Sequence, residues 1–76
     1  MHRPTYAIEQ RLRFIDFLFS QYGYFNRSAL MAYFGISMPQ ASKDIKDYIE
    51  MAPGNATYDV RTKRYVKTEL FKEVYP

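Results

Sequence analysis

The chain contains no cysteine, no tryptophan and only one histidine among its 76 residues. Without cysteine it can form neither a disulfide framework nor a thiolate metal site. A single histidine, His2, provides neither a nucleophile–base pair nor the ligand cluster of a zinc site. Three glycines are too few for a glycine-rich phosphate-binding loop. Asp44 and Asp47 have the spacing of ordinary carboxylates on a helix surface, so we expect neither catalysis nor a bound cofactor.

Long apolar segments are also missing. No run approaches the roughly 18 residues that a membrane-spanning helix requires, and the N-terminal MHRPTYAIEQRLR lacks the apolar core of a signal peptide. We therefore predict a cytoplasmic protein without a membrane partner. The length is that of one small domain. A content of 47% hydrophobic and 18% aromatic residues is enough to build a core without cross-links.

The N-terminal part of the chain predicts a long amphipathic helix. Thr5 is its expected N-cap, and Gly23 its expected C-terminal stop. The apolar face recurs at helical spacing and consists of Ile8, Leu12, Ile15, Phe19 and Tyr22. Phe14 and Phe17 lie off this face, so we expect a second surface to cover them, either the C-terminal part of the chain or another molecule.

Two further helices are predicted to meet at a tight corner. Asn26 caps the first of them, and Gly35 ends it. Ser37 caps the next, with Pro39 in its first turn, where a missing backbone N–H has no consequence. The predicted buried face of that helix consists of Ala41, Ile45, Tyr48 and Ile49. Pro53-Gly54-Asn55 then breaks the helical pattern.

Strand-forming residues flank a short polar turn in the last part of the chain. The segments ATYD, from Ala56, and RYVK, from Arg64, lie on either side of VRTK, which predicts a β-hairpin. Thr68 and Glu69 then open a further predicted helical stretch.

This order of elements is that of a winged helix-turn-helix, an α+β, mostly α fold. It has three helices and a two-stranded hairpin, the wing. We predict a DNA-binding domain over residues 1–67, and over residues 68–76 the start of a linker helix toward an absent C-terminal domain.

The outer face of the third helix, residues 38–50, is polar. A rotation of 100° per residue places on it Pro39, Gln40, Lys43 and Lys46, with Ser42 at its edge. Hydrogen-bonding side chains at the N-terminal end of a recognition helix can reach base edges or phosphates in the major groove. The acids Asp47 and Glu50 are expected toward the other end, withdrawn from the phosphates.

Positive charge is concentrated in the predicted hairpin, although the net charge is only +3. Within it, residues 61–67 hold Arg61, Lys63, Arg64 and Lys67 and no acidic residue. The cations of residues 60–64 can hold the DNA backbone or enter the minor groove. Arg27 and Ser28 can bind a phosphate with the N–H groups that begin the second helix. These features predict sequence-specific binding to double-stranded DNA.

Two alternatives remain open. Winged helices also serve as protein-interaction modules, and the apolar residues Phe14 and Phe17 could form such a site, but this role does not need a basic wing. Structured RNA could bind the same charge, although the A-form major groove is too narrow for a helix. Tyr22, Tyr24 and Tyr33 are expected in or around the core rather than stacked on bases.

Several segments together resemble a known family. They are RLRFIDF (11–17), FGISMPQASKDIKDY (34–48), Ala52, Pro53 and Asn55, and YDVRTKRYV (58–66). They are similar to the N-terminal winged-helix domain of WYL-domain transcriptional regulators. Among these they look most like bacterial repressors encoded beside phage-defence operons of the BREX and CBASS types.

The resemblance implies a repressor that binds an inverted-repeat operator as a homodimer. By position it places in or beside the major groove Ser37, Pro39, Gln40, Ser42 and Lys43, and on the wing Arg61, Lys63 and Arg64. It also implies a WYL sensor domain that would bind the effector, and this domain is expected beyond Pro76.

Overall fold

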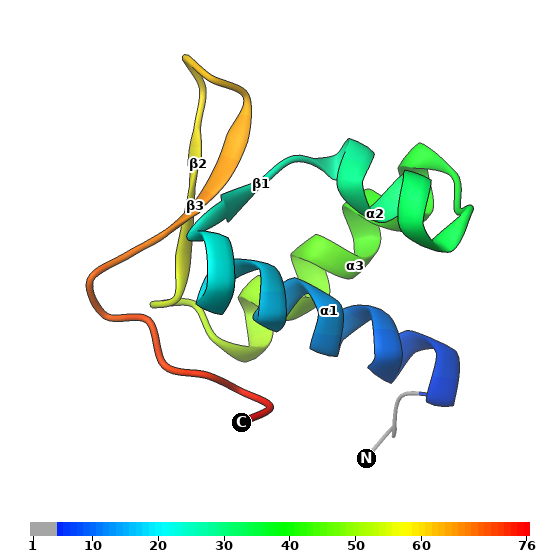
Figure 1. Cartoon of the computed structure of the whole chain (residues 1–76), viewed down its shortest axis with the longest axis horizontal. Coiled ribbons are helices and arrows are strands. Elements are labelled where there is room, and N and C mark those ends of the chain that lie inside the picture. The colour runs from blue at the N-terminus through cyan, green and yellow to red at the C-terminus, as the bar shows by residue number, and fades with distance from the viewer. Residues whose placement is uncertain (1–4) are drawn as a thin grey trace.

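The computed structural model describes residues 5–76, and His2 lies outside this range. Three helices and three strands follow one another along the chain (Figure 1). They are α1 (Tyr6–Tyr22), β1 (Tyr24–Phe25), α2 (Arg27–Phe34), α3 (Met38–Met51), β2 (Ala56–Asp59) and β3 (Arg64–Lys67). The predicted winged helix-turn-helix architecture is confirmed.

The three predicted N-caps are confirmed by their hydrogen bonds. The side-chain oxygens of Thr5, Asn26 and Ser37 each accept a backbone N–H from the first turn of the helix that follows. Gly23 ends α1, and Gly35 ends α2. Both glycines adopt the left-handed conformation, which a residue with a Cβ adopts only at a cost.

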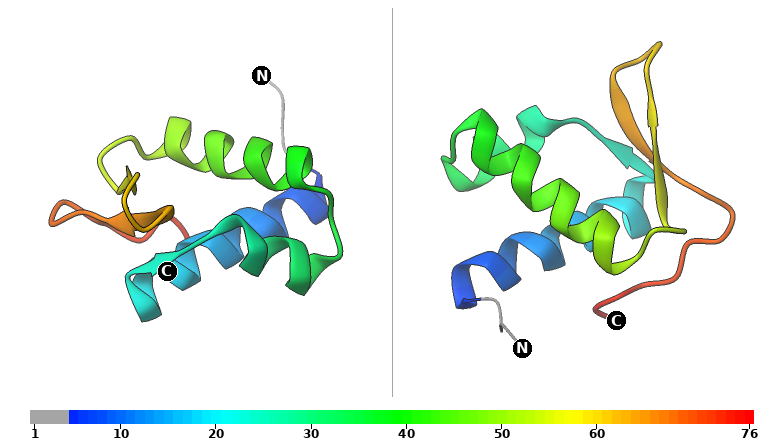
Figure 2. Two further views of the ribbon diagram at one scale, coloured as in Figure 1. Left: turned by 90° about the horizontal axis from the view of Figure 1, so that it is seen from above. Right: turned by 180° about the vertical axis from the view of Figure 1, so that it is seen from behind.

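The corner between α2 and α3 depends on Gly35. Its φ is 65°, and its N–H donates to the Met31 carbonyl at 2.8 Å. Only Ile36 and Ser37 then separate it from the start of α3. The short connection turns the chain so that α3 lies against α1, with its outer side toward the viewer in the rear view of Figure 2.

The sheet has a third strand that the sequence did not predict. Its order is β1-β3-β2, and both pairings are antiparallel. In β1, Tyr24 pairs with Val66, and Phe25 pairs with Tyr65. Two residues are too few to show the alternation that identifies a strand in a sequence. This pairing attaches the base of the wing to the end of α1.

The core lies where the three helices meet the sheet. The fully buried apolar side chains include Leu12, Ile15, Phe19, Leu30, Ala41, Ile45 and Tyr48. Phe25 of β1 adds to them and lies 4.9 Å from Phe19 between ring centroids. The apolar faces predicted for α1 and α3 therefore supply most of the core, although Tyr22 is 65% exposed and Ile49 only partly buried.

The helical stretch predicted from Thr68 onward does not form. After β3 the chain makes a turn at residues 69–70 and then runs without regular structure along α1 (red in Figure 1). Its N–H groups donate to side-chain oxygens of the domain: that of Lys72 to Asn55, and those of Val74 and Tyr75 to Asp16. Helix formation would require the same N–H groups to find carbonyl partners in the preceding turn.

Candidate nucleic-acid interface

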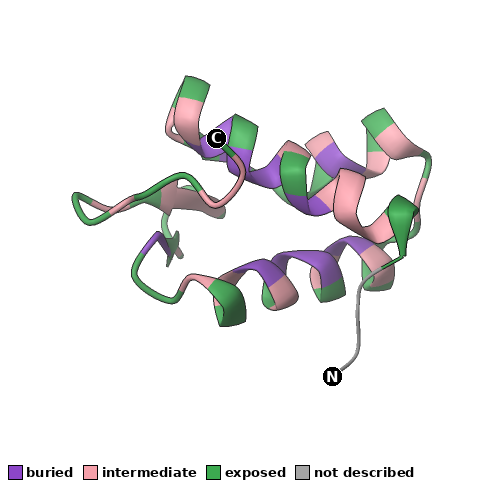
Figure 3. Ribbon diagram, turned by 90° about the horizontal axis from the view of Figure 1, so that it is seen from below, coloured by how far each residue is buried: buried purple, intermediate pink, exposed green. Residues whose placement is uncertain are grey.

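The outer side of α3 is polar, as predicted. In Figure 3, α3 is the lowest helix, with its buried residues along the side that faces the other elements. Ser37, Pro39, Lys43 and Lys46 are exposed, whereas Gln40 and Ser42 are half-buried. The prediction of the exposed face is therefore correct in outline, but two of the polar side chains are engaged within the protein.

Gln40 is held along the helix by Asp44. Its side-chain Nε2 donates to Asp44 Oδ1 at 3.0 Å. Asp44 is only 1% exposed and pairs with Arg11 of α1, whose Nε lies 2.5 Å from Asp44 Oδ2. The expectation of a surface carboxylate at Asp44 is therefore wrong. The apolar pattern of α3 did not reveal the pair because its partner lies on another helix.

Asp47 reaches back toward the N-terminal half of α3. Its Oδ2 accepts from Lys43 Nζ at 2.9 Å, and this hydrogen bond and the charge of Asp47 raise the pKa of Lys43. Asp47 was expected toward the C-terminal end of α3, away from the phosphates. This expectation is wrong for its carboxylate, which lies beside Lys43 in the N-terminal half of the helix. Lys43 stays charged, and the contact with Asp47 uses only one of the three N–H donors of its ammonium group, so the other two remain for a phosphate or base.

Arg27 and Ser42 are brought together from different helices. Arg27 Nη1 donates to Ser42 Oγ at 2.9 Å. This bond connects the start of α2 to the outer edge of α3, so the predicted phosphate site and the predicted base-reading surface are continuous.

The wing ends in a turn shaped by Asp59. Asp59 Oδ1 accepts the backbone N–H of Arg61 at 3.0 Å, and Oδ2 accepts the Thr62 hydroxyl at 2.9 Å. The bond from Thr62 is the main cause that lowers the pKa of Asp59. Lys63 has a positive φ of 57°, which is uncommon for a residue with a side chain. The turn leaves Arg61 and Lys63 exposed at the tip.

Arg64 differs from the other two wing cations. It is half-buried, and its guanidinium lies 4.2 Å from the centroid of the Tyr24 ring. This cation–π contact holds Arg64 over β1. The stacking partner comes from the strand that the sequence did not reveal, so the restraint on Arg64 could not be predicted.

A pocket of about 220 Å³ lies between the start of α2 and the wing. Its lining consists of Asn26, Arg27, Ser28, Tyr58, Lys63 and Tyr65. It combines two cations with hydroxyl groups, which are the groups that bind phosphate oxygens. Tyr58 and Tyr65 were expected only as strand residues, and their cross-strand pairing, with ring centroids 4.8 Å apart, places them here.

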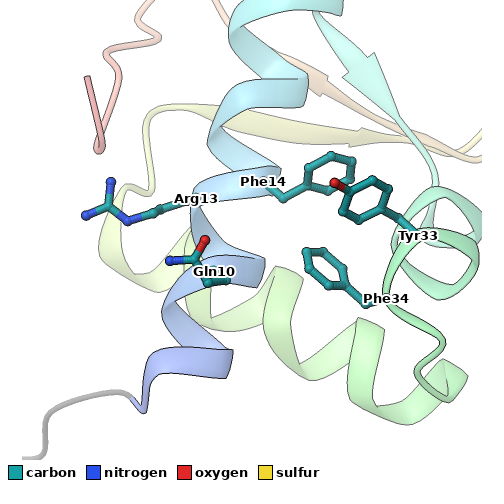
Figure 4. A pocket seen from close by; sticks show the side chains of 5 residues that line it. All are labelled: Gln10, Arg13, Phe14, Tyr33 and Phe34. Carbon is teal, nitrogen blue, oxygen red and sulfur yellow. The ribbon is translucent and has the colours of Figure 1, made fainter.

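A second pocket, of about 380 Å³, lies between α1 and α2 (Figure 4). It is lined by Gln10, Arg13, Phe14, Tyr33 and Phe34. Phe14 stacks on Tyr33 with ring centroids 4.4 Å apart, and Phe14 and Phe34 pack edge to face. Residues of α2 thus cover Phe14, whereas the C-terminal part of the chain or another molecule was expected to do so.

Phe17 is not covered in the same way. It is 49% exposed, and Tyr22, Tyr24 and Tyr33 are exposed at the rim of the core. The apolar surface on which the protein-interaction alternative depends is therefore present, and it belongs mainly to α1.

Within residues 5–76, no group of three or more His, Cys, Asp or Glu side chains is arranged to hold a metal ion. None of the described helices is long and apolar enough to cross a membrane.

Comparison with known proteins connects this geometry to a family. The model of the BrxR transcriptional regulator winged helix-turn-helix domain matches residues 7–75. The chain belongs to this BrxR family. It is 50% identical over 68 residues to the DNA-binding transcriptional repressor CapW of Pseudomonas aeruginosa, with 90% of this chain and 23% of the relative covered.

Similar relatives come from other bacteria. CapW of Escherichia coli (strain KTE188) is 48% identical over 67 residues, which cover 88% of this chain and 22% of that protein. CapW of Stenotrophomonas maltophilia is 45% identical over 65 residues, which cover 86% of this chain and 22% of that protein. The BrxR-family domain thus spans less than a quarter of the length of these relatives. The predicted resemblance to winged-helix domains of defence-operon regulators is confirmed, and the relatives are named as repressors rather than enzymes.

Proposed function

We propose that this domain binds double-stranded DNA in a sequence-specific manner and belongs to a transcriptional repressor. The observation that carries the proposal is the continuity of one polar, basic surface. Arg27 bonds to Ser42 of α3 and lines the same pocket as Lys63 of the wing. Recognition helix, phosphate site and wing can therefore meet a single duplex at once, which is how winged helix-turn-helix proteins dock.

The residues divide by the part of DNA that they reach. Gln40, Ser42 and Lys43 choose bases in the major groove, with Ser37 and Pro39 beside it. Phosphate contacts come from Arg27, Ser28, Lys46, Arg61, Lys63 and Arg64. The contact between Gln40 and Asp44 limits the rotamers of Gln40, so its amide is oriented before DNA arrives.

The contribution of the wing to DNA affinity is tested by two single substitutions, each of which removes one positive charge. Lys63→Ala should lower affinity for every duplex and reduce the slope of log K against log salt by about 0.9, which is one phosphate contact. Arg13→Ala removes an exposed cation of α1 at the other pocket and should leave that slope unchanged. Equal slopes for the two variants would contradict the assignment of Lys63 in the wing as a phosphate contact.

Base recognition needs a different comparison. Gln40→Ala should relax preference at one position of the operator and change affinity for unrelated duplexes little. Competition between the preferred duplex and its single-base variants measures this effect. An unchanged preference would remove Gln40 from the set of base-reading residues.

We infer that the complete regulator acts as a homodimer on an inverted repeat. Support comes from the likeness to CapW, named as a DNA-binding transcriptional repressor, and from the two-fold symmetry that helix-turn-helix dimers share with their operators. Half-sites should lie about one helical turn, or a multiple of it, apart. Gel shifts on duplexes with varied half-site spacing test this, and equal affinity for all spacings would argue for independent monomers.

The wider setting follows from the same resemblance. We propose that residues 1–67 are the DNA-binding unit, that residues 68–76 lead toward a WYL-type sensor domain, and that the regulated genes serve phage defence in the bacterial cytoplasm. The protein-interaction alternative depends on the exposed Phe17. It would be preferred if the domain bound no duplex even at low salt.

A further inference from the structure

Asp16 of α1 is a buried carboxylate that joins three parts of the fold. It is 1% exposed. Its Oδ1 accepts from the hydroxyl of Tyr48 in α3 at 2.5 Å, and its two oxygens accept the N–H groups of Val74 and Tyr75 at 3.0 Å. A carboxylate in this position is tolerated because every part of it is hydrogen-bonded.

Asn55, in the turn after α3, completes the same network. It is 4% exposed, and its Nδ2 donates to Tyr48 Oη at 3.1 Å and to the Lys72 carbonyl at 2.7 Å. Its Oδ1 accepts the Lys72 N–H at 3.0 Å. Asn55 thus holds the C-terminal segment as a neighbouring strand would, while it also contacts the recognition helix.

Tyr48 is the point at which the network meets α3. Its side chain is fully buried, and both burial and the hydrogen bond to Asp16 raise its pKa. Among residues 5–76 no buried side-chain nitrogen or oxygen lacks a hydrogen-bond partner. If the C-terminal segment left Asp16 and Asn55, both side chains would have unpaired polar atoms next to Tyr48. The resulting loss of free energy would also weaken the packing of α3, because both residues are hydrogen-bonded to Tyr48.

We propose that residues 72–75 form a strap that positions α3 for DNA, so that docking of the strap and DNA binding strengthen each other. The strap has no regular structure, and its side chains are exposed at Lys72 and Glu73 and only partly buried at Val74 and Tyr75, so it can open locally without global unfolding. Any force or ligand that lifts the strap would then act on the recognition helix through Tyr48. This proposal rests on the proposed DNA binding.

Hydrogen exchange provides the direct test, because coupling between two sites is reciprocal. The amide protons of Val74 and Tyr75 should exchange more slowly when the domain is saturated with a duplex selected from random sequences. The amide of Leu70 lies in the same segment but bonds to Thr68 Oγ1, and it serves as the internal control that should change little. We expect a selective slowing of about 5- to 150-fold, the usual range of such couplings.

A substitution gives the reverse measurement. Asn55→Ala should weaken binding of the same duplex by a factor similar to the slowing of exchange, whereas Gln21→Ala, at an exposed position of α1, should not. Circular dichroism on both variants establishes that the helices remain folded.

The outcomes separate the strap from the proposed function. If the parent domain binds the duplex but the strap amides slow no more than Leu70, the strap is only structural and the proposal is overturned. The proposal is also overturned if folded Asn55→Ala binds the duplex as tightly as the parent. If the parent binds no duplex, the proposed function itself fails, and the strap proposal falls with it.

Discussion

Asp44 and Asp47 allow a sharp test of which charges hold α3 in place. Both are aspartates on the same helix, and both accept a hydrogen bond from a cation. Asp44 and its partner Arg11 have side chains only 1% and 13% exposed. Asp47 and its partner Lys43 are 32% and 65% exposed. The two substitutions to Asn keep the shape of the side chain and remove one negative charge each.

The expected magnitudes differ widely. Breaking a buried ion pair by removal of one partner typically costs about 3–5 kcal/mol, because the other charge stays buried. At Asp44 the loss also affects Gln40, which donates to the same carboxylate. The exposed Lys43–Asp47 pair is screened by solvent and contributes far less. A domain of 76 residues has a total stability of about 4–11 kcal/mol, so Asp44→Asn should remove a large part of it.

Urea denaturation followed by circular dichroism measures both free energies of unfolding. We expect a large fall in the midpoint for Asp44→Asn and almost none for Asp47→Asn. The double variant Arg11→Met with Asp44→Leu should recover much of the loss, since apolar replacements for both members of a buried pair are often neutral. Similar small losses for the two single variants would refute the view that the Arg11–Asp44 pair fixes α3 on α1.

Three further predictions concern single positions. Gly35→Ala should cost about 1–2 kcal/mol because its φ is positive, whereas Gly54→Ala meets nothing nearer than 3.9 Å and should cost less; urea midpoints compare the two. Lys63→Gly should stabilise the domain by up to about 1 kcal/mol through relief of its positive φ, yet weaken DNA binding, as melting and titration would show. Tyr48 has a raised pKa in the folded state, so its contribution to stability is complete below about pH 10 and falls as the pH rises further. In Tyr48→Phe, the free energy of unfolding should therefore fall less steeply above about pH 10. An unchanged pH profile would contradict the assignment of this loss to Tyr48.

The fold was predictable wherever local chemistry decides structure. Caps at Thr5, Asn26 and Ser37, stops at Gly23 and Gly35, and the apolar spacing in α1 and α3 each depend on neighbouring residues. The hairpin was predictable from strand-type residues around a polar turn. Strand β1 and the path of the C-terminal segment were not, because both depend on partners distant in sequence.

The candidate interface shows the same division. Helical periodicity identified the exposed positions of α3, and charge clustering identified the wing. The restraints on Gln40, Lys43 and Arg64 come from Asp44, Asp47 and Tyr24, respectively. Asp44 was misjudged because a buried carboxylate looks like a surface residue until its cation, on another helix, is known.

The most direct test of the central claim is selection of random duplex DNA on the purified domain, followed by titration of the enriched sequence at several salt concentrations. We predict enrichment of a defined half-site and a loss of affinity with salt of about 0.9 log units per phosphate contact for each log unit of salt. The surface that joins α3, Arg27 and the wing is then a DNA-reading surface. Absence of binding to every duplex, even at low salt, would contradict the account.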